Sequence, residues 1–428
     1  MNILIINTNC SWNKGSAAQV ISTVETLRSL LPDSNFVMMS DNLPELDFEP
    51  CKKHGVQVFG LPRKKPLSKG AYLVMLCHLS DDLLRCILWS SFRKIGLTVN
   101  RLLSKDVLRQ YTTSDIVIDL SGDTLSDHGS YSIFCLLRIL VPLLLDKPVI
   151  VYSQSIGPFS KINAPIARFC LDNVRLIVVR ETETISILKD IGVCNPNIQL
   201  AADVAFLLKP EHSTRVDEIL LKEGVNKANG YPLIGLGTSS LIYKILGDGN
   251  ESYLKFMASL ADYLVENMNA QVILISHVIV PSQYDYKDDR YIAQKIYQIV
   301  KHKDRIKPIE DDYSPEELKG LIGNCELFIG TRMHSVIAAV SMLVPTVTLG
   351  WSHKYHGIMS MICQDELCCD IRTTNFNEVV LKITYAWNRR EEIKKSLSFK
   401  IPEMEKSALL GNTLIKNLIE QILSQKQI

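Results

Sequence analysis

Short apolar runs rich in β-branched residues recur along the chain, and each ends in a polar turn that leads into a helical pattern. The runs lie at 2–6, 36–39, 116–120, 149–152, 176–179, 233–237, 272–276, 327–330 and 346–350. A strand that is buried on both faces reads as a continuous apolar run, so this alternation predicts parallel strands joined by helices. We therefore expect an α/β fold with two facing doubly wound, Rossmann-like domains.

A polar segment at 209–232, punctuated by Pro210, Gly224, Gly230 and Pro232, separates the two sets of runs. The predicted organisation is an N-terminal α/β domain at 1–208, a linker at 209–232, a C-terminal α/β domain at 233–387 and a helical tail at 388–428. Whether that tail returns to the N-terminal domain is left open. Ligands of such sheets bind at the carboxyl ends of the strands, so we expect the site in the cleft between the domains.

Charge and cysteine usage exclude several classes of protein. The 428 residues carry a net charge of +1, which gives no global field for nucleic acid. The 11 cysteines are scattered, several of them within apolar runs, so we expect reduced, buried thiols. They form no CxxC pair, so no metal site is expected. We also expect no cofactor. The start of the chain does not read as a signal peptide, and no apolar run is long enough for a membrane span. We expect a cytoplasmic protein, with a place at the inner face of the membrane left open.

The strongest candidate for chemistry is the segment that follows the run at 327–330. Arg332 can hold a carboxylate or phosphate with two hydrogen bonds, and His334 can donate a proton near neutral pH. Ser335 is expected to cap the helix that begins here, whose N-terminus favours an anion. The alternative is a capping serine beside a solvated arginine and a packed histidine.

Two further sets of cationic residues follow strand ends. His353 and Lys354 come after the run at 346–350 and suit contact with a phosphate or a sugar better than a metal, although an ordinary surface loop is an equal alternative. Arg180 ends the run at 176–179. It can clamp an anion, or it can form an ion pair with Glu181 or Glu183.

Two loops of the first half carry polar residues suited to a sugar. Asn13 and Gly15 lie in the first strand-to-helix loop, which matches neither a dinucleotide fingerprint nor a Walker loop. Asp123, Asp127 and His128 can supply a general base or orient a hydroxyl. A simple turn and polar capping are the respective alternatives. A third loop contains Asp285, Asp288 and Asp289, which we interpret as solvated acidic residues.

The stretch at 71–92 has a broad apolar face and follows four basic residues at 63–69. It fits a membrane-surface helix that meets a lipid-linked acceptor. A helix packed against the core, or an interface with a partner, is the favoured alternative.

Taken in order, these segments resemble the polysaccharide pyruvyl transferase family over roughly 1–361. The segments that carry the resemblance lie at 13–18, 119–123, 153–158, 180–186, 202–206, 331–334 and 353–359. The sequence departs from the common pattern at Ala17 and Ala18, where many members have an acidic residue. It departs again at Ser121-Gly122-Asp123, where the family has a longer glycine-rich turn.

The resemblance implies a fold like that of GT-B glycosyltransferases and transfer of pyruvate from phosphoenolpyruvate to a sugar as a ketal. Arg180, Arg332, Ser335, His353 and Lys354 are then expected to bind the donor. His334, Asp123 and His128 are expected to be catalytic, and Asn13, Gly15 and Asp127 to contact the acceptor. The expected partners are phosphoenolpyruvate and a sugar or lipid-linked oligosaccharide, but no nucleic acid.

Two other functions compete with this hypothesis. A GT-B-type glycosyltransferase that uses a nucleotide sugar would place Arg332 and Lys354 on a diphosphate. A non-catalytic, membrane-associated polysaccharide assembly protein would keep the fold without turnover. Peripheral membrane contact and a homo-oligomer are left open.

Overall fold

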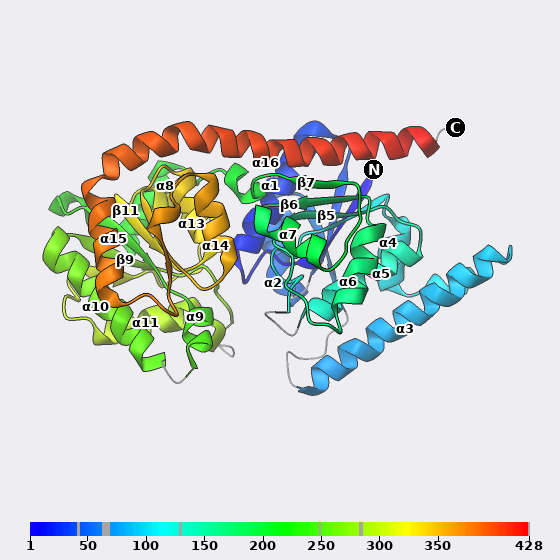
Figure 1. The fold of residues 1–428 in the computed structure, drawn as a ribbon, viewed down its shortest axis with the longest axis horizontal. Coiled ribbons are helices and arrows are strands. Elements are labelled where there is room, and N and C mark those ends of the chain that lie inside the picture. The colour runs from blue at the N-terminus through cyan, green and yellow to red at the C-terminus, as the bar shows by residue number, and fades with distance from the viewer. Residues whose placement is uncertain (41–42, 62–68, 128–130, 248–249, 282–285, 427–428) are drawn as a thin grey trace. The chain divides into compact units, whose positions relative to one another are not determined.

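The computed structural model describes residues 1–428 except 41–42, 62–68, 128–130, 248–249, 282–285 and 427–428 (Figure 1). The chain forms two compact units. The first unit comprises Met1–Cys10, Gln19–Val204 and Ser407–Ile428, and the second comprises Ser11–Ala18 and Ala205–Lys406. Each unit is described by itself below.

The described part of the first unit contains a parallel sheet with the strand order β3-β2-β1-β4-β5-β6-β7. The strands are β1 (Asn2–Thr8), β2 (Asn35–Ser40), β3 (Val56–Gly60), β4 (Ile116–Asp119), β5 (Val149–Gln154), β6 (Leu176–Val179) and β7 (Ile198–Leu200). Every residue of β4, β5 and β6 is buried, as their unbroken apolar runs require. This order is that of a doubly wound sheet, with the switch of direction at β1 and β4.

Helices cover this sheet and close its core. They are α1 (Lys14–Leu30), α2 (Pro44–Lys53), α3 (Lys69–Lys94), α4 (Asp106–Thr113), α5 (Ser132–Leu144), α6 (Ala164–Asn173) and α7 (Thr182–Asp190), with a short 3-10 helix η1 at Asn100–Leu103. The core on one face joins Leu4, Val117 and Val151 of the strands to Leu136 and Ile139 of α5. Figure 1 shows α3 as a long straight helix in light blue.

The second unit repeats the same plan in its described residues, with the strand order β10-β9-β8-β11-β12-β13 and parallel pairing throughout. Its strands are β8 (Leu233–Gly237), β9 (Gln271–Ile275), β10 (Ile306–Pro308), β11 (Leu327–Gly330), β12 (Thr346–Gly350) and β13 (Cys368–Asp370). The two doubly wound sheets confirm the predicted α/β fold class.

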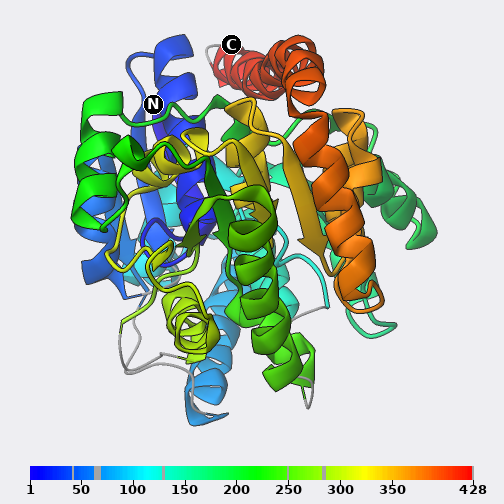
Figure 2. The ribbon, with the colours of Figure 1, turned by 90° about the vertical axis from the view of Figure 1, so that its left-hand side faces the viewer.

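Figure 2 looks onto the second unit, where helices surround the sheet. They are η2 (Val204–Leu207), α8 (Ser213–Lys222), η3 (Lys227–Asn229), α9 (Ser240–Ile245), α10 (Asn250–Met268), α11 (Asp289–Ile299), α12 (Pro315–Gly323), α13 (Met333–Ser341), α14 (His353–Met361), η6 (Asp365–Leu367), α15 (Phe376–Asn388) and α16 (Arg390–Lys426). No helix among the described residues is both long and apolar enough to cross a bilayer.

The segment 209–232, predicted as a linker, packs within the second unit. A Cβ on Gly320 of α12 would lie 2.6 Å from Val216, so α8 approaches α12 closely at this glycine. Buried Lys319 donates to the carbonyl oxygens of Phe206 and Leu208, at 3.4 and 2.5 Å. The first contact holds the segment 209–232 against α12, and the hydrogen bonds of Lys319 hold the residues that directly precede it.

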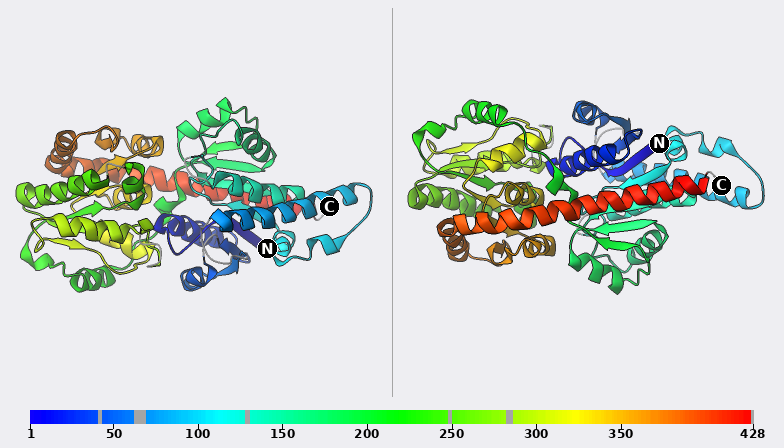
Figure 3. Two further views of the ribbon diagram at one scale, coloured as in Figure 1. Left: turned by 90° about the horizontal axis from the view of Figure 1, so that it is seen from below. Right: turned by 90° about the horizontal axis from the view of Figure 1, so that it is seen from above.

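Two other segments group differently from the predicted ranges. Ser11–Ala18 belongs to the second unit, although α1 continues from it into the first. The predicted helical tail is α16, which Figure 3 shows as one continuous helix in orange and red. Its residues from Ser407 onward belong to the first unit, where the Ser407 hydroxyl accepts a hydrogen bond from the backbone of Ala202 at 3.0 Å.

Candidate active site in the second unit

The turn from β11 into α13 places Arg332 and His334 at the carboxyl edge of the second sheet. Arg332 is the N-cap of α13 and has an extended backbone, so His334 falls in the first helical turn. A Cβ on Gly330 would lie 2.4 Å from Val336, which shows how closely the strand end meets the helix. The sequence therefore brings these two side chains to a helix N-terminus, as predicted.

Arg332 forms a bidentate ion pair with Asp289. Its Nε and Nη2 lie 3.0 and 2.6 Å from the carboxylate oxygens, and Nη2 also donates to the Ser240 hydroxyl at 3.1 Å. Burial acts to lower the pKa of Arg332, but the charge of Asp289 and its hydrogen bonds outweigh it and raise that pKa. Nη1 makes no hydrogen bond to any residue that the structure describes, so one edge of the guanidinium remains for a ligand.

Asp289 was wrongly interpreted as part of a solvated acidic loop. It is fully buried at the start of α11 and accepts hydrogen bonds from the backbone of Ser240, His277 and Val278 at 2.8, 3.3 and 2.9 Å. Its neighbour Asp288 is also buried and caps α11 through the backbone of Arg290. A free N–H at the start of α11 thus holds Asp288, whereas Asp289 turns inward to backbone N–H groups of other segments. Asp285 lies outside the described residues.

The first strand-to-helix loop contributes to this site. The backbone of Lys14 donates to the His277 carbonyl at 3.0 Å, and Asn13 forms an isolated β-bridge with Val278. The buried Lys14 ammonium pairs with Asp312. Sequence reasoning placed this loop in the N-terminal domain, because a chain pattern shows the order of elements and not which sheet a loop contacts.

Gly15 lies directly against the imidazole of His334. A Cβ on Gly15 would lie 2.2 Å from His334 Nδ1 and 2.4 Å from its Cγ. Real atoms do not approach so closely, so only glycine leaves room for the ring. The loop thereby fixes the place of the predicted catalytic histidine, and a contact of Gly15 with the acceptor stays a prediction.

We expect Gly15→Ala to lower kcat by at least tenfold, since a displacement of about 1 Å at a reacting group can cost about 10²-fold. Gly224→Ala is the matched control. Gly224 has φ +73° and open space around it, so its replacement strains only the backbone. Steady-state assays on both variants separate the effects. Equal activity in the two would show that the His334 contact is not needed.

His277 is a site residue that the sequence analysis did not single out, although it directly follows β9. Burial, together with the smaller effects of the neighbouring His334, Arg332 and Lys14, lowers the pKa of His277 to about 3. Its Nδ1 is buried and makes no hydrogen bond to the described residues. His277 is therefore a neutral, buried histidine that lies near the cationic side chains of Lys14 and Arg332.

The low pKa of His277 predicts a specific loss of stability in acid. Between pH 6.5 and 5 the unfolded chain binds a proton that folded His277 does not, so the free energy of unfolding falls as the pH falls. The His277 share of this loss is about 2 kcal/mol. Chemical denaturation at both pH values should show that His277→Gln loses less free energy of unfolding between them than the native protein, by the share that His277 contributes. Equal losses in both proteins would contradict the assignment.

The segment at 353–359, for which a surface loop was an alternative, is the start of α14 with Lys354 and Tyr355 buried. The Lys354 ammonium lies over the Trp351 ring at 5.0 Å from its centroid. The Tyr355 hydroxyl donates to the Thr331 carbonyl at 3.0 Å, which ties α14 to the turn that contains Arg332. The His353 side chain lies outside the described part of the structure.

Ser335 does not cap α13, contrary to the prediction. It is the third residue of the helix, and its hydroxyl donates to the Arg332 carbonyl at 2.7 Å. A capping side chain accepts from a free N–H at the N-cap position, and here that position is occupied by Arg332, whose side chain makes no capping hydrogen bond. Donor binding by Ser335 stays a prediction.

Arg180 lies in the first unit and is fully buried, with its closest ion pair to Asp203 and a longer one to Glu181, which was one of the two predicted partners. Its Nη1 lies 2.7 Å from Asp203, its Nε donates to Ser155 at 2.8 Å, and Glu181 is 3.8 Å away. Its Nη2 is buried and has no hydrogen-bond partner among the described residues. Arg180 thus has one donor group left for an anion, and its role in donor binding stays a prediction.

Asp127 organises a loop of the first unit. Its carboxylate accepts from Ser132, from the backbone of Ser160 at 2.6 Å and from Asn163 at 2.9 Å. Burial acts to raise its pKa, but these hydrogen bonds lower it to about 2. The Asp127 carboxylate already accepts hydrogen bonds from residues of its own loop, and this weakens the prediction that it contacts a sugar. Asp123 lies half-buried in a turn, and His128 falls outside the described residues.

The described residues contain no group of three or more histidine, cysteine, aspartate or glutamate side chains arranged to hold a metal. What the second unit brings together is a set of cations and histidines at the carboxyl ends of β9 and β11, balanced by two aspartates. Such an arrangement suits a small dianion and proton transfer to or from it.

The two doubly wound sheets define a pair of Rossmann-like domains. Solved structures with this fold include a UDP-N-acetylglucosamine 2-epimerase from Listeria monocytogenes, described as putative. It has 12% identity and a TM-score of 0.61, over 96% of this chain and 93% of that one. A glycosyltransferase from Rickettsia africae has 11% identity and a TM-score of 0.58, over 98% of each chain. At such low identity these likenesses establish the GT-B-like fold alone.

The family model for polysaccharide pyruvyl transferases matches residues 13–353, and the chain belongs to that family. It is also 25% identical to the amylovoran biosynthesis protein AmsJ of Erwinia amylovora, over 99% of this chain and all of that one. The expected resemblance is thus confirmed, and the chain is a transferase of polysaccharide biosynthesis.

Proposed function

We propose that the protein transfers pyruvate from phosphoenolpyruvate to a sugar of a polysaccharide or its precursor and forms a ketal. The observation that carries this proposal is the site at the carboxyl ends of β9 and β11, where Arg332 is held by Asp289, His334 packs against Gly15, and the backbone of Lys14 bonds to that of the buried His277. That electrostatic environment favours a small ligand with both a phosphate and a carboxylate.

The proposed chemistry begins with proton transfer from His334 to the methylene carbon of the enol. The central carbon becomes cationic, and a sugar hydroxyl attacks it and releases a proton. The C–O bond to phosphate then breaks, with the electron pair leaving on inorganic phosphate. A second hydroxyl adds to the same carbon, loses its proton and closes the ketal. Arg332 stabilises the negative charge of the donor through the edge that Asp289 leaves open.

A nucleotide-sugar glycosyltransferase is the second candidate, since the fold supports it. One solved neighbour, HepE of Anabaena, is described in complex with UDP and glucose, with 12% identity and a TM-score of 0.59. UDP and glucose are ligands of HepE in that structure. The two candidates differ in the product, because only pyruvyl transfer leaves a quaternary ketal carbon.

The direct test incubates the protein with isotope-labelled phosphoenolpyruvate and polysaccharide repeat units from cells that lack the gene. Pyruvyl transfer predicts inorganic phosphate release together with an NMR signal of a ketal carbon. Transfer of a sugar from a UDP-sugar to the same units, without that signal, would overturn the proposal in favour of the second candidate.

A further inference from the structure

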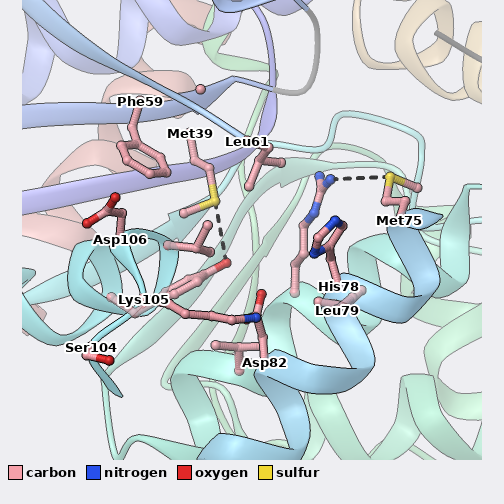
Figure 4. Close-up of a pocket in the computed structure, with 15 residues that line it drawn as sticks. Met39, Phe59, Leu61, Met75, His78, Leu79, Asp82, Ser104, Lys105 and Asp106 are labelled. Carbon is pink, nitrogen blue, oxygen red and sulfur yellow. Dashed lines mark hydrogen bonds and ion pairs between the residues drawn. The ribbon is translucent and has the colours of Figure 1, made fainter. Parts of the chain in front are cut away.

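The first unit contains a cavity of about 550 Å³ that plays no part in the site described above. Figure 4 shows its walls, which are formed by the ends of β2 and β3 and by α3, α4 and α5. Seven of the 15 lining residues have apolar side chains, namely Met39, Phe59, Leu61, Met75, Leu79, Val107 and Val141. Thioethers adapt to irregular shapes, so the methionines suit a flexible apolar guest.

Nitrogen donors stand on one wall of this cavity. His78 lies on α3, and Arg138 comes from α5 and is almost fully buried. Arg138 Nη1 donates to Asn7 at 3.2 Å, and its Nη2 lies 4.0 Å from the Met75 sulfur, a weak acceptor. A buried guanidinium beside an apolar cavity favours an anionic group there, because it contributes a charge-assisted hydrogen bond.

The cavity rim also carries charge. Lys105 pairs with Asp81 and Asp82, and Asp82 lies 2.9 Å from the ammonium. The lining thus combines an apolar body with polar ends, as a site for an amphipathic molecule requires.

Helix α3 is apolar on its outer side as well. Met75 and Leu79 line the cavity, whereas Val74, Leu84 and Ile87 are about half exposed on other sides of the helix. Exposed Ile95 and Leu97 follow, together with the basic residues Arg93, Lys94 and Arg101. An apolar face with basic residues at its end is typical of contact with an anionic lipid surface.

We propose that this cavity binds the aliphatic chain of a lipid that carries an anionic head group. The chain lies among the methionine, leucine and phenylalanine side chains, and the head group lies near Arg138 and His78. In the proposed reaction this makes the acceptor a lipid-linked glycan. That last step rests on the proposed function, but lipid binding itself does not.

The test titrates the full chain by calorimetry with farnesyl phosphate, farnesol and inorganic phosphate. Farnesyl phosphate is expected to saturate one site, and farnesol to bind about tenfold more weakly because it lacks the charge-assisted bond. Inorganic phosphate alone should not compete. Competition by phosphate would assign the anion site to a free ion and overturn the lipid proposal.

Two neighbouring substitutions decide where the probe binds. Met75→Trp fills the cavity and is expected to weaken farnesyl phosphate at least tenfold, whereas Val74→Trp adds the same ring outside it and should not. Equal affinity in both variants, or an equal loss, would contradict the proposal. Phosphoenolpyruvate titrations on the same samples report separately on the donor site and on folding.

Discussion

A His334→Gln variant is expected to turn over about 10²–10⁴-fold more slowly than the native protein, with little change in KM for phosphoenolpyruvate. Glutamine keeps a polar side chain of similar size but cannot deliver a proton to carbon. The imidazole is placed for this task at the first turn of α13 and held against Gly15. Steady-state assays of phosphate release measure both constants.

The matched control is His356→Gln. His356 is an exposed histidine of α14 that faces Ser360, at 3.2 Å from its hydroxyl. Its replacement should leave both constants unchanged. A His334 variant that raises KM while kcat stays native would show that this histidine binds the donor and is not the acid.

An Asp289→Asn variant is expected to lose about 3–5 kcal/mol of the free energy of unfolding. The substitution removes the counter-charge of Arg332 and leaves a guanidinium in the protein interior without its bidentate partner. It also presents an amide NH₂ to at least one backbone N–H that now donates to the carboxylate. Chemical denaturation, followed through the transition of the second unit, measures the loss.

Asp370→Asn tests whether the effect comes from burial. Asp370 and Arg372 form the same bidentate pair, but their side chains are 38% and 51% exposed. We expect a cost below about 1 kcal/mol there, because water screens an exposed pair. Similar costs for the two variants would mean that the Asp289–Arg332 pair contributes no more than a surface contact.

The central strands were predictable because a strand that is buried on both faces has an unbroken apolar run in the sequence. β6, β8, β11 and β12 have the predicted bounds, and the other predicted strands differ by one or two residues at one end or at both. β3, β7, β10 and β13 were missed. β7 is exposed at two of its three residues, and β10 and β13 are three residues long and contain Lys307 and Asp370. Outer strands with one open edge need no continuous apolar run.

The candidate site was only partly predictable. Arg332 and His334 follow a buried strand and precede a helix, so their place at the sheet edge could be read from the order of residues. Asp289 could not, because nothing in an acidic loop tells which carboxylate turns inward to meet an arginine 43 positions further on. The contact of Gly15 with His334 is likewise tertiary, since it depends on which sheet the first loop packs against.

The central claim is that the second unit binds phosphoenolpyruvate, and a calorimetric titration tests it most directly. Phosphoenolpyruvate and a UDP-sugar would each be titrated into the native protein and into Arg332→Lys, which keeps a cation for Asp289 but loses the planar fork. The account predicts saturable binding of phosphoenolpyruvate that weakens at least tenfold in the variant. Binding of the UDP-sugar alone, or equal binding of phosphoenolpyruvate by both proteins, would contradict it.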